Sequence, residues 1–100
     1  TLPLLACGAD GVISVTANAY PGEFSEMVRM GMAGNLKKAR QLHYKLLDFT
    51  NALFLDGSPS GIKAALEIKK LCHHYVRLPL VSVRPEVHRQ LKNIIDLLEQ

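Results

Sequence analysis

Apolar residues recur at intervals of three and four residues along most of the 100-residue chain, the spacing that places them on one face of a helix. This pattern predicts a helix end at the N-terminus, closed by Gly8, followed by four longer helices. We expect these at about Glu23 to Ala33, Leu36 to Phe54, Pro59 or Ser60 to Cys72, and Pro85 to Leu98. Gly34 should end the first and Asn35 cap the second, while Ser58 should cap the third.

One short stretch departs from the helical spacing. In "GVISVTAN" the run Val12 to Val15 is rich in β-branched residues and is apolar or small on both faces, which is typical of a strand in a parallel sheet. The sequence "VRLPLVSV" should also be extended, because Pro79 disfavours the helical conformation at Leu78. A single strand cannot pair its own backbone groups. We therefore expect its neighbours to lie on sequence outside these 100 residues.

The composition is that of an ordinary globular chain, with 48% hydrophobic and 21% charged residues and a net charge of +3. The basic residues are spread along successive helices without interleaved aromatic residues, so a solvated face explains them better than a nucleic-acid site. No apolar run approaches the length of a membrane span. Only two cysteines occur, Cys7 and Cys72, without a short spacing or a signal peptide, which favours the cytoplasm.

Few residues suggest chemistry of their own, and the pattern predicts no cofactor and no metal site. Cys72, His73 and His74 are adjacent, so on a helix they would point about 100° apart and could not share one ion. Neither Ser14 nor Thr16 has the surroundings of an activated nucleophile. The remaining histidines, His43 and His88, are more typical of packing or surface positions.

Three blocks resemble, in order and separation, the C-terminal part of the dihydrodipicolinate synthase family. They read "GADGVISVTAN", "LFLDGSPSGIKAAL" and "VRLPLVSV", and together they cover nearly the whole chain. The second block departs from the family pattern Asn-Pro-x-Pro-x-Lys, because Gly61 stands in place of the second proline. We expect that glycine to loosen the loop.

The resemblance implies an α/β fold, of which this chain, mainly α as it stands, holds the end. The family has a (β/α)₈ TIM barrel followed by a helical C-terminal domain. Residues 1–34 would then contain a helix end, the eighth barrel strand and the eighth helix. Residues 35–100 would form the C-terminal helical domain.

The resemblance also implies a function for the intact enzyme. The family is a lyase that condenses pyruvate with aspartate semialdehyde in lysine and diaminopimelate biosynthesis, through a Schiff base on a lysine and a proton-relaying tyrosine. Both residues lie earlier in the family sequence, so no catalytic residue is expected in this chain, Lys63, Lys69 and Lys70 included. Ile13 matches the family residue beside bound pyruvate. A cytoplasmic homotetramer without cofactor is implied.

Two alternatives remain open from the sequence. Related Schiff-base enzymes such as N-acetylneuraminate lyase share the barrel. No residue in this chain is expected to recognise the second substrate, so the sequence does not distinguish between these enzymes. The chain could also be a free-standing helical interaction module whose strand pairs with a partner.

Overall fold

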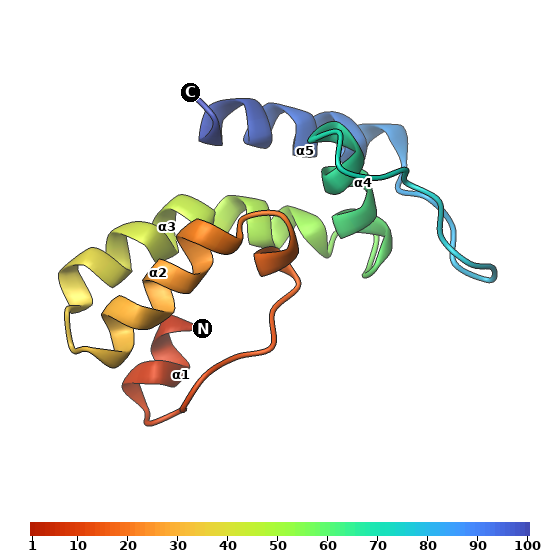
Figure 1. Cartoon of the computed structure of the whole chain (residues 1–100). Helices are drawn as coiled ribbons and strands as arrows, with labels where there is room; N and C mark the ends of the chain where they lie inside the picture. The colour runs from red at the N-terminus through yellow and green to blue at the C-terminus, as the bar shows by residue number, and fades with distance from the viewer. The chain divides into compact units, whose positions relative to one another are not determined.

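The computed structural model describes all 100 residues, and every regular element in it is a helix (Figure 1). The chain divides into two compact units, residues 1–47 and 48–100. Their boundary falls inside the longest helix. In chain order the elements are α1 (Leu2–Ala6), the 3₁₀ helix η1 (Thr16–Asn18), α2 (Pro21–Met32), α3 (Leu36–Leu53), α4 (Ser60–Ile68) and α5 (Pro85–Leu98).

The first unit is built around α2, which contacts both α1 and η1. Phe24 and Met27, three residues apart, give α2 a buried face. Leu5 of α1 is also buried, and it approaches α2 closely at Gly31, where a Cβ atom would lie 3.0 Å from Leu5 Cδ1. The absence of a side chain at Gly31 therefore permits the tight α1–α2 contact.

The predicted boundary between α2 and α3 is confirmed. Gly34 has a φ of 83°, in the left-handed region that glycine adopts without steric cost. Asn35 accepts a hydrogen bond from the Lys38 backbone N–H through Oδ1 at 3.3 Å, which caps the start of α3. The ending of α1 at a left-handed Gly8 is confirmed in the same way, with a φ of 104°.

The strand predicted at Val12 to Val15 is wrong for this chain, because residues 9–15 have no regular secondary structure. A strand exists only when a neighbouring strand supplies its hydrogen-bonding partners, and no other segment here does so. The chain instead turns at Val15, whose carbonyl accepts the Asn18 N–H at 3.1 Å and begins η1. Helix α2 accordingly starts two residues earlier than expected, at Pro21, a favoured residue for a first helical position.

The second unit contains the C-terminal part of α3, with α4 packed on α5. The predicted helix from Pro85 to Leu98 is confirmed with those bounds. Its buried side consists of Val87, Leu91 and Ile95, spaced four residues apart, with Ile94 half-buried beside them. Because this face is continuous, its burial is the main apolar contribution of α5 to the unit.

Helix α4 starts at Ser60, as predicted, but differs from expectation in its capping residue and at its C-terminal end. Its N-cap is Pro59, not Ser58, and it ends at Ile68 instead of Cys72. Lys70 has a φ of 63°, so the chain leaves the helix through a left-handed residue that is not glycine. Residues other than glycine seldom adopt this conformation, and the sequence therefore did not indicate where the helix ends.

Gly61 does not loosen a loop as expected, because it lies within α4 at the closest approach to α3. A Cβ atom at this position would lie 1.9 Å from the Leu53 carbonyl oxygen. Leu53 is itself only 1% exposed. The glycine therefore lets two backbones meet.

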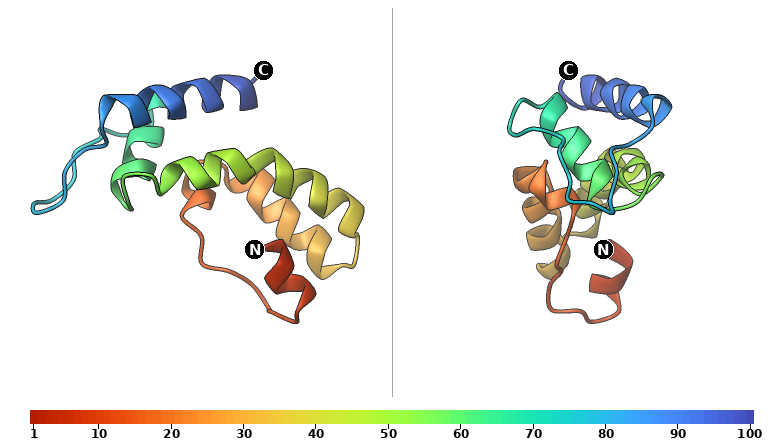
Figure 2. Two further views of the ribbon diagram at one scale, coloured as in Figure 1. Left: turned by 180° about the vertical axis from the view of Figure 1, so that it is seen from behind. Right: turned by 90° about the vertical axis from the view of Figure 1, so that its right-hand side faces the viewer.

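The connection between α4 and α5 extends away from both helices, as the left-hand view shows (Figure 2). It contains a turn at Leu78 and Pro79, closed by a hydrogen bond from the Leu80 N–H to the Arg77 carbonyl at 3.0 Å. The prediction that "VRLPLVSV" is non-helical is confirmed. Leu78, at 79% exposure, is among several large apolar side chains that this connection leaves uncovered.

Candidate functional site

The segment before η1 carries Ile13, the one residue expected to contact substrate. Ile13 is completely exposed, with a relative accessibility of 104%. Its neighbours Val12 and Ser14 line a groove of about 480 Å³ in the first unit, whereas Ile13 does not. In an extended backbone, successive side chains point to opposite sides. The structure thus leaves Ile13 open and brings no other candidate residue to it.

The groove beside Val12 has an apolar floor and one cation. Phe24 and Val28 of α2 contribute the apolar surface, and Arg29 the positive charge. The Arg29 guanidinium donates a hydrogen bond from Nη1 to Ser25 Oγ at 3.3 Å, which orients it along α2. Such a groove suits an apolar or anionic group, but no histidine, aspartate, glutamate or lysine among its lining residues could activate the serine hydroxyls there.

The chain entering η1 is fixed by local hydrogen bonds. Ser14 Oγ accepts the Ala17 N–H at 3.2 Å, and Asn18 Nδ2 donates to the Val15 carbonyl at 3.1 Å. Thr16 is buried and has interactions of its own. Ser14 and Thr16, weighed above as nucleophiles, therefore both belong to this turn.

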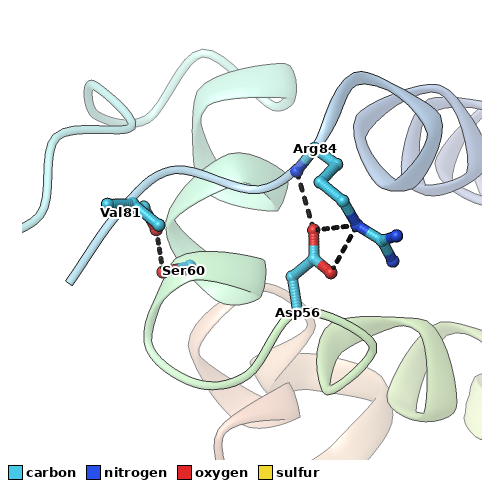
Figure 3. Close-up of polar contacts among 4 residues, drawn as sticks. All are labelled: Asp56, Ser60, Val81 and Arg84. Atoms are coloured by element: carbon cyan, nitrogen blue, oxygen red, sulfur yellow. Dashed lines mark hydrogen bonds and ion pairs between the residues drawn. The ribbon is translucent and has the colours of Figure 1, made fainter.

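Two polar contacts hold the end of the α4–α5 connection in the second unit (Figure 3). Asp56 accepts the Arg84 backbone N–H at 2.7 Å and the Arg84 Nε–H at 2.9 Å. Ser60 donates its hydroxyl to the Val81 carbonyl at 2.5 Å. These contacts join residues 28 and 21 positions apart and fix the approach to α5.

The start of the same connection is held by Glu67 and His74. The Glu67 carboxylate accepts the His74 backbone N–H at 3.2 Å and the Nδ1–H of its imidazole at 2.5 Å. The imidazole hydrogen bond lowers the pKa of the Glu67 carboxyl, against a smaller opposing effect of burial. The sequence did not predict this pair, because the two residues are seven apart and the helix ends between them.

The same pair borders a pocket of about 340 Å³ between α4, the connection and α5. Its polar lining includes His88 of α5 and Ser82 of the connection. His88, expected to be a packing or surface residue, is half-buried and lines this pocket with Glu67 and His74. The pocket thus brings three titratable side chains, Glu67, His74 and His88, to one cavity.

The other candidates remain apart from this pocket. No group of three histidine, cysteine or acidic side chains is placed to hold a metal ion. Cys72 and Cys7 are exposed, free thiols. Burial, reinforced by the Thr1 amino group, lowers the pKa of His43. The Lys69 ammonium lies 3.3 Å from Glu99 in an ion pair.

Comparison with known proteins assigns the family. Residues 1–98 match the family described as "Dihydrodipicolinate synthetase family". The chain belongs to this family. The fold relationship is equally direct, because the solved dihydrodipicolinate synthase from Aquifex aeolicus superposes with a TM-score of 0.95 at 36% identity, over 99% of this chain and 34% of that one. The solved dihydrodipicolinate synthase from Thermotoga maritima also superposes with a TM-score of 0.95 at 36% identity, over 99% of this chain and 34% of that one.

Curated relatives agree with this assignment. The 4-hydroxy-tetrahydrodipicolinate synthase of Phocaeicola vulgatus is 40% identical over 99 residues, covering 99% of this chain and 33% of the relative. That of Geobacter sp. strain M21 is 50% identical over 83 residues, covering 83% of this chain and 29% of the relative. The chain thus spans about a third of the length of the relatives that it matches. None of its helices has the length and apolarity needed to cross a membrane.

Proposed function

We propose that these 100 residues form the C-terminal part of a 4-hydroxy-tetrahydrodipicolinate synthase, a lyase that condenses pyruvate with aspartate semialdehyde. The observation that carries the proposal is the family match over residues 1–98, at a third of the relatives' length. The lysine that would form the Schiff base and the tyrosine that would relay protons lie in the other two-thirds. The chain alone is therefore inactive.

The proposed division of the fold follows from the same assignment. Residues 1–34 complete the barrel, with Val12 to Val15 forming its eighth strand once a neighbouring strand is present, and residues 35–100 form the helical domain. The β-branched sequence of the segment supports this, as does its lack of any competing helix. Backbone groups without partners in this chain are then available for a ladder.

Ile13 is the residue of this chain that we place beside bound pyruvate. Its complete exposure supports this role, because no packing within the chain competes for the side chain. An apolar side chain next to a keto acid excludes water while adding no charge to repel the carboxylate.

The proposal further includes a homo-oligomer, with a tetramer expected, working in the cytoplasm without a cofactor. One related solved structure, at 38% identity and a TM-score of 0.92, is described as the first monomeric dihydrodipicolinate synthase variant. That description supports an oligomer as the ordinary state of the family. The two free, exposed cysteines are compatible with a reducing compartment.

A chimera tests the function. The preceding two-thirds of the Phocaeicola vulgatus relative are joined to this chain, and condensation of pyruvate with aspartate semialdehyde is measured. We expect turnover in the chimera, while the 100-residue chain with pyruvate and borohydride keeps its mass. A folded chimera that is inactive on aspartate semialdehyde but cleaves N-acetylneuraminate would overturn the assignment in favour of the related lyase. A borohydride-trapped adduct on this chain alone would contradict the placement of the catalytic lysine.

Ile13→Asp in the chimera tests the site. Like charges a few Å apart in a protein repel by roughly 1–4 kcal/mol, so the KM for pyruvate should rise by about tenfold or more. Ile13→Val keeps shape and polarity and serves as the matched control, with a KM close to that of the parent. Equal KM values for the two folded variants would show that Ile13 does not face pyruvate.

A further inference from the structure

The pocket bordered by Glu67 and His74 holds polar groups that the fold leaves unused. Glu67 occupies Nδ1 of the His74 imidazole, so its other ring nitrogen, Nε2, is the one without a hydrogen-bonding partner in the chain. The side chains of His88 and Ser82 also line the pocket and likewise have no such partner. Three groups able to donate a hydrogen bond therefore face one cavity of about 340 Å³.

The charges around the pocket favour an anion over a cation. Glu67 is the only carboxylate in the lining, and its Oε2 is already paired with His74. The other titratable residues that line the pocket are His74 from the connection and His88 from α5. When the imidazoles are protonated, the balance is one negative against two positive charges. Charge-assisted hydrogen bonds from imidazolium and hydroxyl groups are those that an oxyanion accepts.

The rest of the wall is apolar and selects among oxyanions. It consists of Ala64 of α4 together with Val83 and Pro85, where the connection enters α5. Such a surface gains from burying a hydrocarbon chain but gives nothing to an inorganic ion. Ser60, also in the lining, already donates its hydroxyl to Val81, which fixes this wall relative to α4.

We propose that this pocket is a binding site for a short-chain carboxylate, whose oxygens accept hydrogen bonds from His74, His88 and Ser82 and whose hydrocarbon chain lies on Ala64, Val83 and Pro85. None of the residues that line this pocket belongs to the first unit, which carries Ile13.

Butyrate is the probe, titrated into the 100-residue chain while the ring signals of its four histidines are followed by NMR. We expect saturable shifts of the His74 and His88 signals, with half-saturation in the millimolar range of butyrate. The signals of His43 and His73 should stay in place, as should all four in matched sodium chloride. Equal shifts of all four signals, or none that saturates, would overturn the proposal.

Two comparisons test the chemistry of the site. Acetate lacks two methylenes of butyrate, and at about fourfold for each buried methylene it should bind roughly 15-fold more weakly. Equal affinities would mean an adventitious ion contact only. His88→Gln should weaken butyrate binding at least tenfold, whereas His73→Gln, at a residue outside the pocket lining, should leave the affinity unchanged. Unaltered binding in folded His88→Gln would refute the site.

Discussion

Gly61→Ala tests the close backbone contact between α4 and the end of α3, which is the contact in the second unit that has the least room to adjust. The added Cβ would lie 1.9 Å from the Leu53 carbonyl oxygen and 2.7 Å from its carbonyl carbon. Carbon and oxygen make their closest favourable contacts at about 3.3 Å, so the two backbones would have to separate by roughly 1.4 Å. Both clashing atoms belong to the backbone, and no change of rotamer can move them. Helix α4 itself must shift away from the end of α3.

The expected cost is the difference of two effects. Overpacking that moves backbone costs up to about 3 kcal/mol, while alanine gains at most about 1 kcal/mol over glycine in helix propensity. The net loss in the free energy of unfolding is then about 2 kcal/mol. For a domain of this size that corresponds to a fall in melting temperature of about 8–16 °C.

The assay is thermal unfolding followed by circular dichroism, with Gly22→Ala as the matched control. Gly22 is likewise the second residue of a helix, but a Cβ there meets nothing within 4 Å. That variant should melt at or slightly above the temperature of the parent chain. If both variants melted together, the close approach of α4 to Leu53 would not exist in solution.

Two further contacts give predictions of their own. Asp56→Ala removes the acceptor of two Arg84 hydrogen bonds and should lower the free energy of unfolding in urea by about 2 kcal/mol. The control Asp96→Ala loses an exposed ion pair and should lower it by less than about 0.5 kcal/mol. Equal losses in the two variants would contradict the anchoring role of Asp56. His74 lowers the pKa of the Glu67 carboxyl. The ionised carboxylate therefore contributes its full stabilisation at pH values above the ordinary glutamate pKa, and this stabilisation is lost as the pH falls through the lowered pKa. Glu67→Gln should accordingly reduce the acid dependence of unfolding below about pH 5, and an unchanged pH profile would contradict this.

Local signals in the sequence were sufficient for most of the helices. Pro85 and Gly34 act within their own turns, through a fixed φ in one case and a left-handed φ in the other, so they mark the same boundaries in the sequence and in the structure. The end of α4 carries no such signal, because Lys70 adopts the left-handed conformation without being glycine. The predicted end was wrong by four residues for that reason.

Contacts between distant residues were beyond the sequence. The Asp56–Arg84 pair joins positions 28 apart, and the pocket around His88 draws on three elements. A single sequence records the side chains but not which elements meet. The family resemblance did lead to the correct family, because three blocks agreed in order and separation, and such agreement does not depend on tertiary contacts.

The two blocks of the resemblance that contain no α-helix share one physical property. The stretch around Ile13 and the stretch around Leu78 are both rich in large apolar residues, and both leave such residues largely exposed. Apolar surface of this extent gains free energy when another surface covers it. Each stretch is nevertheless held at its ends, by η1 in the first case and by Asp56 and Ser60 in the second. An apolar segment that is anchored without being covered is already positioned for a partner surface, and it loses less conformational entropy on binding than a free chain would. In the proposed enzyme that surface is supplied by the other two-thirds of the family fold, which explains why residues that do little for the helices are apolar at these positions.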